Sequence, residues 1–196
     1  MRKLIVAEQL SLDGVMQAPG DPDEDRSGGF QHGGWHLPYF DEVAAGFVGE
    51  AIAETDAFLF GRRTYEIMAR YWPNASEGDM FADTMNRLAK YVASTTLEEP
   101  LSWKNSTLLK GEVRAAVAAL KREQGGNIVV LGSAQLVRTL TEHGLVDEYQ
   151  LMIDPLLLGS GKRLFGQSSQ PIPLRLVDAK TSSTGVLIAT YQPERR

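Results

Sequence analysis

Cysteine is absent from the 196-residue sequence, which excludes disulfides and thiolate metal sites. An excess of positive charge is also missing, because 20 Lys and Arg residues stand against 25 Asp and Glu residues, for a net charge of −5. Nucleic acids and anionic membranes are bound by basic surfaces, so we expect neither as a partner. A local basic patch for a small anion remains compatible with this balance.

Long hydrophobic runs are missing as well. No apolar segment approaches the roughly 20 residues that a membrane-spanning helix needs. The first residues resemble a signal peptide only briefly, because Glu8 and Gln9 interrupt the apolar run. We expect a soluble, cytoplasmic protein. We also expect no metal site, since the three histidines are dispersed and His32 and His36 fall in a glycine-rich loop.

Several familiar site patterns do not occur. The Gly-x-Gly-x-x-Gly fingerprint of the usual dinucleotide site is absent, as is the nucleophile elbow of hydrolases. Gly159 to Lys162 lacks the spacing of a phosphate-binding Walker loop, and no Ser or Thr follows it.

What the sequence does contain is an alternation of short apolar runs and amphipathic segments. This predicts an α/β fold with a mostly parallel central sheet flanked by helices and antiparallel strands at the C-terminal end. The whole chain, 1–196, reads as a single domain. The expected strands are 4–7, 57–60, 91–94, 107–109, 128–131, 149–153 and a hairpin of 174–180 with 186–191; the expected helices cover 43–52, 61–72, 81–88, 112–122 and 134–143.

The turn at Gly132 is the feature around which the chain is organised. A β-branched apolar run ends there, Gly132, Ser133 and Ala134 follow, and a helix begins with Leu136 on its apolar face. Unpaired amides at the start of a helix suit a phosphate. Glycine would let an anion approach closely, although a glycine at a strand–helix turn can also serve only to turn the chain.

A second strand–helix turn begins at Gly61 and places Arg62 and Arg63 at the start of a helix. The helix dipole favours acids at that end, so an anionic ligand would explain this pair of cations, while two solvated surface arginines are the alternative. Carboxyl ends of parallel strands share one edge of a sheet. Together the two turns suggest a dinucleotide, with its pyrophosphate at Gly132 and an extra 2′-phosphate at the arginines.

A loop rich in Gly, Pro and Asp, residues 17–36, is expected to lie over the site. It closes with an aromatic cluster that is followed by Asp41. A carboxyl group beside aromatic walls could anchor a polar heterocycle or relay a proton, and Asp41 could equally be a plain helix cap.

Five motifs in order resemble the dihydrofolate reductase-like superfamily. Within it, the chain is most similar to bacterial proteins related to the C-terminal reductase domain of bifunctional riboflavin-biosynthesis deaminase-reductases. The motifs are the strand with Ser-Leu-Asp-Gly at 4–15, Trp-His-Leu-Pro at 35–38, Gly-Arg-Arg-Thr-Tyr-Glu at 61–66, the segment 128–136, and the segment 147–161 followed by Leu164 and Phe165.

The resemblance implies NADPH as hydride donor and a homodimer formed through the C-terminal strands. It implies that the segment 61–64 holds the adenosine phosphate and that 132–136 holds the pyrophosphate. The implied cofactor-binding residues are Ala7, Asp13, Gly14, Gly61, Arg62, Arg63, Thr64, Ser94, Thr95, Gly132, Ser133, Ala134, Gln135 and Leu136. The candidate substrate-binding residues are Trp35, Asp41, Met68 and Tyr71, with Asp41 also the candidate catalytic residue.

The sequence therefore predicts an NADPH-dependent reductase of a small heterocycle, either a pterin or a pyrimidine of the riboflavin pathway of the 5-amino-6-(5-phosphoribosylamino)uracil type. The alternative is a non-catalytic NADP- or pterin-binding protein on the same fold. It is motivated by Phe40, which occupies the place where the aligned acid of dihydrofolate reductases would stand.

Overall fold

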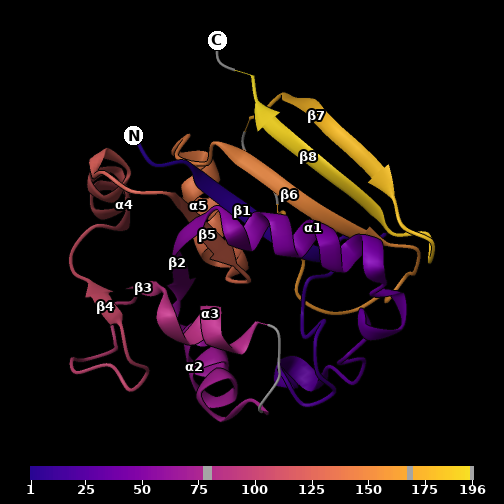
Figure 1. The fold of residues 1–196 in the computed structure, drawn as a ribbon, viewed down its shortest axis with the longest axis horizontal. Coiled ribbons are helices and arrows are strands. Elements are labelled where there is room, and N and C mark those ends of the chain that lie inside the picture. Colours follow the sequence, from indigo (N-terminus) through magenta and orange to yellow (C-terminus); the bar gives the residue numbers. More distant parts are fainter. Residues whose placement is uncertain (77–80, 167–169, 195–196) are drawn as a thin grey trace.

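A computed structural model of the chain describes residues 1–76, 81–166 and 170–194. One sheet crosses the molecule, with strand order β4-β3-β2-β5-β1-β6-β8-β7 (Figure 1). The strands are β1 (Leu4–Ser11), β2 (Thr55–Gly61), β3 (Ala89–Ala93), β4 (Ser106–Leu109), β5 (Asn127–Leu131), β6 (Glu148–Asp154), β7 (Leu174–Thr181) and β8 (Leu187–Pro193). The pairs from β4 to β6 are parallel, and β8 pairs antiparallel with both β6 and β7. The predicted fold class is thereby confirmed.

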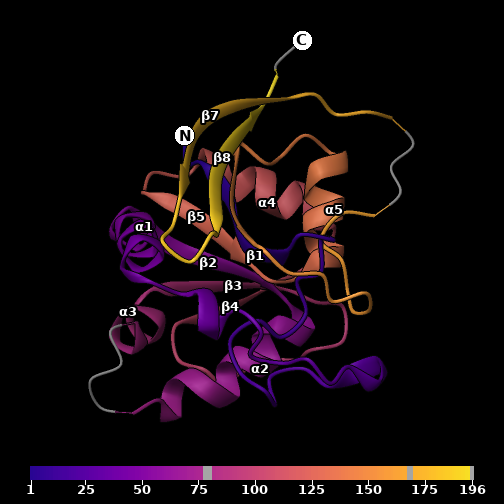
Figure 2. The same cartoon turned by 90° about the vertical axis from the view of Figure 1, so that its right-hand side faces the viewer.

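Helices cover both faces of this sheet (Figures 1 and 2). The α-helices are α1 (Glu42–Ala53), α2 (Arg62–Tyr71), α3 (Ala82–Arg87), α4 (Val113–Arg122) and α5 (Ala134–Glu142), and short 3-10 turns occur at Ser27–Gly29, Leu37–Tyr39 and Trp72–Asn74. Within the described ranges, no helix is long and apolar enough to cross a membrane.

Alternate residues of the central strand β1 divide the core between the two faces, as a period of two requires. Leu4 and Val6 pack with apolar residues of α4 and α5, such as Val117 and Val137. Ile5 packs instead in the cluster that contains Tyr65 of α2 and Met85 of α3. Helix α1 covers the neighbouring part of that second face, where Ala44 packs with Met152 and Ile188 of β6 and β8.

The first strand is longer than predicted. The sequence places its end at Ala7, because Glu8 and Gln9 break the apolar run. In the structure β1 continues to Ser11, since it pairs with β6 as far as the register Ser11 to Asp154. The apolar run thus underestimates a strand whose second half carries polar side chains into the region of the site.

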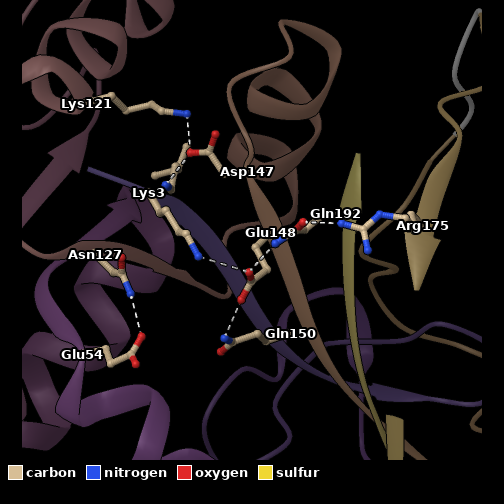
Figure 3. Close-up of polar contacts among 10 residues, drawn as sticks. Lys3, Glu54, Lys121, Asn127, Asp147, Glu148, Gln150, Arg175 and Gln192 are labelled. Atoms are coloured by element: carbon tan, nitrogen blue, oxygen red, sulfur yellow. Dashed lines mark hydrogen bonds and ion pairs between the residues drawn. The ribbon is translucent and has the colours of Figure 1, made fainter. Parts of the chain in front are cut away.

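The amino end of the sheet is held by polar contacts on the side away from the two glycine turns (Figure 3). Asp147 Oδ2 accepts hydrogen bonds from the Leu4 amide at 2.8 Å and from Lys121 Nζ of α4 at 2.5 Å. Nearby, Glu148 Oε2 accepts a 3.0 Å hydrogen bond from Gln192 of β8 and lies 3.7 Å from Lys3 Nζ. These contacts join the helix layer, β1, β6 and β8 at one end and leave the carboxyl ends of β1, β2 and β5 to a cleft.

Candidate functional site

A cleft of about 1110 Å³ lies along the carboxyl ends of the parallel strands. Its walls come from the strand–helix turns at Gly61 and Gly132, from residues 93–96 after β3, and from the loop that follows β1. The cleft contains most of the predicted cofactor and substrate residues: Gly61, Arg62, Arg63, Thr64, Met68, Tyr71, Ser94, Thr95, Gly132, Ser133, Ala134, Gln135 and Leu136.

The two glycine turns touch each other directly. The Gly61 amide donates a 2.8 Å hydrogen bond to Ser133 Oγ. Gly132 has a φ of +60°, and a Cβ built there would lie 2.9 Å from Thr64 Cγ2. The amide of Gly132 is also engaged, since it hydrogen-bonds the carboxyl group of Glu8. Gly132 is therefore needed for the approach of Thr64 and for its left-handed backbone, and its role in holding a pyrophosphate stays a prediction.

The first turns of α2 and α5 remain available to an anion. In the part of the chain that the structure describes, no side chain caps either helix: Gly61 occupies the N-cap of α2 and Ser133 that of α5. Neither helix has an acidic residue in its first turn, so the positive end of each dipole is uncompensated there. Both helix starts lie in the wall of the same cleft.

Arg62 and Arg63 stand in the first turn of α2, and both are exposed. Among the described residues, no carboxylate forms an ion pair with either arginine. This end of the cleft is consequently electropositive. The arrangement can bind a phosphorylated group through guanidinium donors and helix-start amides together.

The opposite part of the cleft is built by the loop after β1. Gln17 Nε2 donates to the carbonyl oxygens of Asp25 and Ser27, and Lys162 Nζ contacts Asp25 Oδ2 at 2.5 Å and Ser27 Oγ at 2.6 Å. These bonds hold the loop against the segment after β6. The expectation that the loop lies over the site is confirmed by the presence of residues 16–21, 23–25, 36, 37 and 40 in the cleft wall.

Two ionisable groups in this wall were not identified from the sequence. Glu8 is 4 % exposed, and burial raises the pKa of its carboxyl group well above the usual value, with the nearby charge of Glu24 adding to the effect and the Gly132 hydrogen bond opposing it. The interruption of a buried apolar strand by Glu8 was a signal that could have revealed it.

The second group is His36, which is 5 % exposed and lines the cleft. Its Nδ1 lies 2.8 Å from Oδ2 of the fully buried Asp154, at the end of β6. Burial raises the pKa of Asp154, and the hydrogen bond to His36 acts in the opposite direction. No sequence signal joined these residues, because 118 positions separate them.

Several predicted site residues lie outside the cleft wall. Asp41 caps α1 by accepting from the Ala44 amide at 2.9 Å, and its other oxygen accepts from Ser183 Oγ at 2.6 Å. These bonds lower the pKa of Asp41 from 3.8 to about 2, with the Ser183 side chain the largest cause. The sequence left open whether Asp41 anchors a ligand or only caps a helix, and in the structure Asp41 is the N-cap of α1.

The remaining predicted residues outside the wall support the loops around it. Trp35 is buried and donates a 2.8 Å hydrogen bond from Nε1 to the Gln17 carbonyl. Asp13 accepts from the amides of Leu158 and Gly159, which ties the turn containing Gly14 to the segment after β6. Ala7 is half-buried in β1, beside Leu131 of β5.

Comparisons with known proteins agree with this architecture. The chain is 36% identical over 181 residues to the uncharacterized protein YwjB of Bacillus subtilis (strain 168), covering 91% of each chain. It is 32% identical over 141 residues to YyaP of the same organism, covering 70% of this chain and 74% of the relative.

Two solved structures show the same fold at low sequence identity. A protein of Shewanella sp. PV-4 named for riboflavin biosynthesis superposes with a TM-score of 0.71 at 21% identity, covering 98% of this chain and 99% of its own. Dihydrofolate reductase from Enterococcus faecalis, complexed with NADP(H) and RAB-propyl, superposes with a TM-score of 0.63 at 14% identity, covering 98% and 97%. The RibD C-terminal domain pattern matches residues 2–188, and the chain belongs to that family.

Proposed function

We propose that this protein is an NADPH-dependent reductase that transfers a hydride to a small heterocyclic substrate of the pterin or riboflavin-pathway pyrimidine type. The observation that carries the proposal is the meeting of two uncapped helix starts, α2 and α5, in the wall of one cleft beside Arg62 and Arg63. Family membership and the reductase fold of the neighbours support the same reading.

The strand order supports one orientation for the proposed cofactor. From β3 through β2 and β5 to β1, the cleft wall presents Ser94 and Thr95, then Arg62 and Arg63, then the start of α5. A dinucleotide lying along this wall would place its phosphates at the helix starts and its nicotinamide over β1. NADPH, when bound, would supply the hydride, and the chain would supply orientation and the exclusion of water.

The substrate would occupy the part of the cleft beyond β1. The cleft wall also includes apolar side chains that suit a planar ring, those of Leu37, Phe40, Met68, Tyr71 and Trp72. Trp72 Nε1 donates to Met68 Sδ at 3.0 Å, which fixes these two side chains relative to each other.

Fluorescence titration of the protein with NADPH and with NADH tests the proposal. We expect saturable binding of NADPH and weaker binding of NADH. Failure of both to bind contradicts the proposed function. Equal affinities would remove only the assignment of Arg62 and Arg63 to the 2′-phosphate.

A non-catalytic NADP- or pterin-binding protein is the second candidate, and the position of Asp41 favours it. The carboxylate expected to anchor a substrate is engaged by Ser183 and by the start of α1. NADPH consumption with dihydrofolate, with the riboflavin-pathway pyrimidine or with members of an imine and quinone panel decides between the two candidates. Turnover of any of them excludes the non-catalytic one.

We also propose a homodimer through the C-terminal strands. β7 is the last strand of the sheet, and its open edge carries Leu174, Leu176 and Val177 at 38%, 51% and 45% exposure. An exposed apolar edge strand promotes association. Light scattering is expected to give twice the chain mass, and Leu176→Lys is expected to give the monomer.

A further inference from the structure

We infer that His36, held in place by Asp154, delivers the proton that accompanies hydride transfer to a carbon–nitrogen or carbon–oxygen double bond of the substrate. The inference rests on the proposed reductase function and names the class of bond reduced. The observation behind it is that His36 Nε2 is a buried polar atom that has no hydrogen-bond partner among the described residues.

A buried ring nitrogen without a partner costs free energy, and in native structures such atoms need an explanation. His36 lines the cleft, so a polar atom of a bound substrate can supply the missing partner. A group that serves only to attach the loop would satisfy its hydrogen bonds within the protein. The Trp35 side chain next to it does so, with its single donor bonded to Gln17.

Asp154 fixes the ring of His36. The 2.8 Å contact joins Asp154 Oδ2 to Nδ1, and with an ionised Asp154, which can only accept, Nδ1 is the ring nitrogen that carries a hydrogen. The second ring nitrogen, Nε2, then points away from β6. Edge-to-face contact with the Phe40 ring, at 5.5 Å between centroids, restricts rotation of the imidazole.

The position of His36 agrees with the path proposed for the cofactor. Asp154 ends β6, and β6 is the strand next to β1 on the side away from β5. A nicotinamide over β1 would therefore have the helix starts on one side and His36 on the other. The apolar residues Leu37 and Phe40 follow His36 in the same wall and provide a surface for the substrate ring.

NADPH, when bound in the cleft, would supply a hydride to the carbon of the substrate C=N or C=O bond and would be oxidised to NADP⁺. The π-electron pair of that bond moves to the nitrogen or oxygen and forms a bond to the proton of His36 Nε2. The N–H bond of His36 breaks, its electron pair stays on the imidazole, and solvent returns the proton after the product leaves.

The other charged groups of this region are less suited to the role. Lys162 and Asp25 are paired with each other. Glu24 accepts a 2.8 Å hydrogen bond from the Gly20 amide. Glu8 lies on the α4 and α5 face of β1, together with Val6 and Leu10, whereas α2, which carries the cleft-lining Met68, lies on the other face.

A comparison of two kinds of acceptor tests the inference. Reduction of 2-methyl-1-pyrroline or 7,8-dihydrofolate requires a proton on nitrogen, whereas menadione accepts a hydride to form a stabilised hydroquinone anion. With NADPH saturating, we expect His36→Gln to lower kcat on the C=N acceptors about 100-fold or more, the size of a general-acid contribution. Turnover of menadione and the Kd for NADPH should change less than about threefold.

Two further variants separate catalysis from anchoring of the loop. Asp154→Asn keeps a hydrogen-bonding group behind the ring and removes its charge, so a smaller loss confined to C=N acceptors is expected. Thr184→Val is the matched control, because it removes a 2.5 Å hydrogen bond from Thr184 Oγ1 to the Tyr39 carbonyl in the same loop but has no contact with the cleft. Its ratio of C=N to quinone turnover should equal that of the wild type.

Different results contradict the proposed reductase function and the proposed role of His36. A wild-type protein that binds neither NADPH nor NADH contradicts the proposed function itself. Binding of NADPH with no reduction of a C=N acceptor overturns the role of His36. An equal loss of both acceptor activities in His36→Gln, or no loss, also overturns it, because a proton donor must affect the C=N acceptors selectively.

Discussion

The Gly61 amide and Ser133 Oγ are joined by a 2.8 Å hydrogen bond. This bond connects the last residue of β2 with the N-cap of α5, although the two are 72 positions apart. It fixes the starts of α2 and α5 relative to each other. The end of the cleft that we propose to bind phosphate is therefore preorganised by the protein itself, which would lower the entropic cost of binding a dinucleotide.

Gly132→Ala is expected to destabilise the protein more than Gly144→Ala. Both glycines have a left-handed φ, +60° and +63°, and alanine in that conformation costs about 1–2 kcal/mol. Only at Gly132 would the new Cβ meet another group, Thr64 Cγ2 at 2.9 Å, whereas nothing lies within 4 Å at Gly144. Urea unfolding of the two variants measures the difference, and equal losses would show that Thr64 moves aside freely.

The double variant Arg62→Ala and Arg63→Ala is expected to weaken NADPH binding about tenfold and to leave NADH binding unchanged. Exposed guanidinium contacts to a phosphate are worth about 1–2 kcal/mol, which converts to such a factor. Arg122→Ala, at the far end of α4, is the matched control. A parallel loss for both cofactors would assign the arginines to the pyrophosphate instead.

Lys162→Met is expected to loosen the loop over the cleft. Lys162 Nζ contacts Asp25 and Ser27 there, and its loss leaves Gln17 as the main attachment of that segment. Hydrogen exchange of amides 20–30 should accelerate, while the exchange of β1 stays unchanged. Lys110→Met removes an exposed pair with Glu99 away from the loop and serves as the control.

Asp147→Asn is expected to lower the free energy of unfolding by about 1–3 kcal/mol, because the buried Lys121 side chain and the Leu4 amide share Asp147 Oδ2 (Figure 3). Lys3→Met is the comparison, since Lys3 is exposed and 3.7 Å from Glu148, and it should cost less than about 0.5 kcal/mol. Chemical denaturation distinguishes the two. Equal values would mean that the Asp147 contacts are no stronger than a surface pair.

The lowered pKa of Asp41 makes the free energy of unfolding depend on pH in the range between about 4 and about 2. Its folded-state pKa is lowered from 3.8 to about 2, so the unfolded state binds a proton first as the pH falls. The stabilisation is complete above about 4 and is lost as the pH falls toward about 2. Thermal unfolding across this range should show a steeper decline for the wild type than for Asp41→Asn. NADPH affinity should be the same in both, whereas a loss in the variant would restore Asp41 to the site.

The architecture, and the two strand–helix turns that line one end of the cleft, could be predicted from the sequence. Apolar runs and helical periodicity are local properties, and they placed the strands of the sheet and the two strand–helix turns. The residues of those turns are contiguous, so Arg62, Arg63 and the segment 132–136 could be assigned to one cleft as soon as the strands were taken to be parallel.

Only the tertiary structure shows which side chains contact Asp41 and His36. Which of two open interpretations applies to Asp41 depends on Ser183, which lies 142 positions away. The His36–Asp154 pair forms only when a loop after β1 is laid against the end of β6. Such contacts follow from the packing of the sheet, and no periodicity or spacing in the chain specifies them.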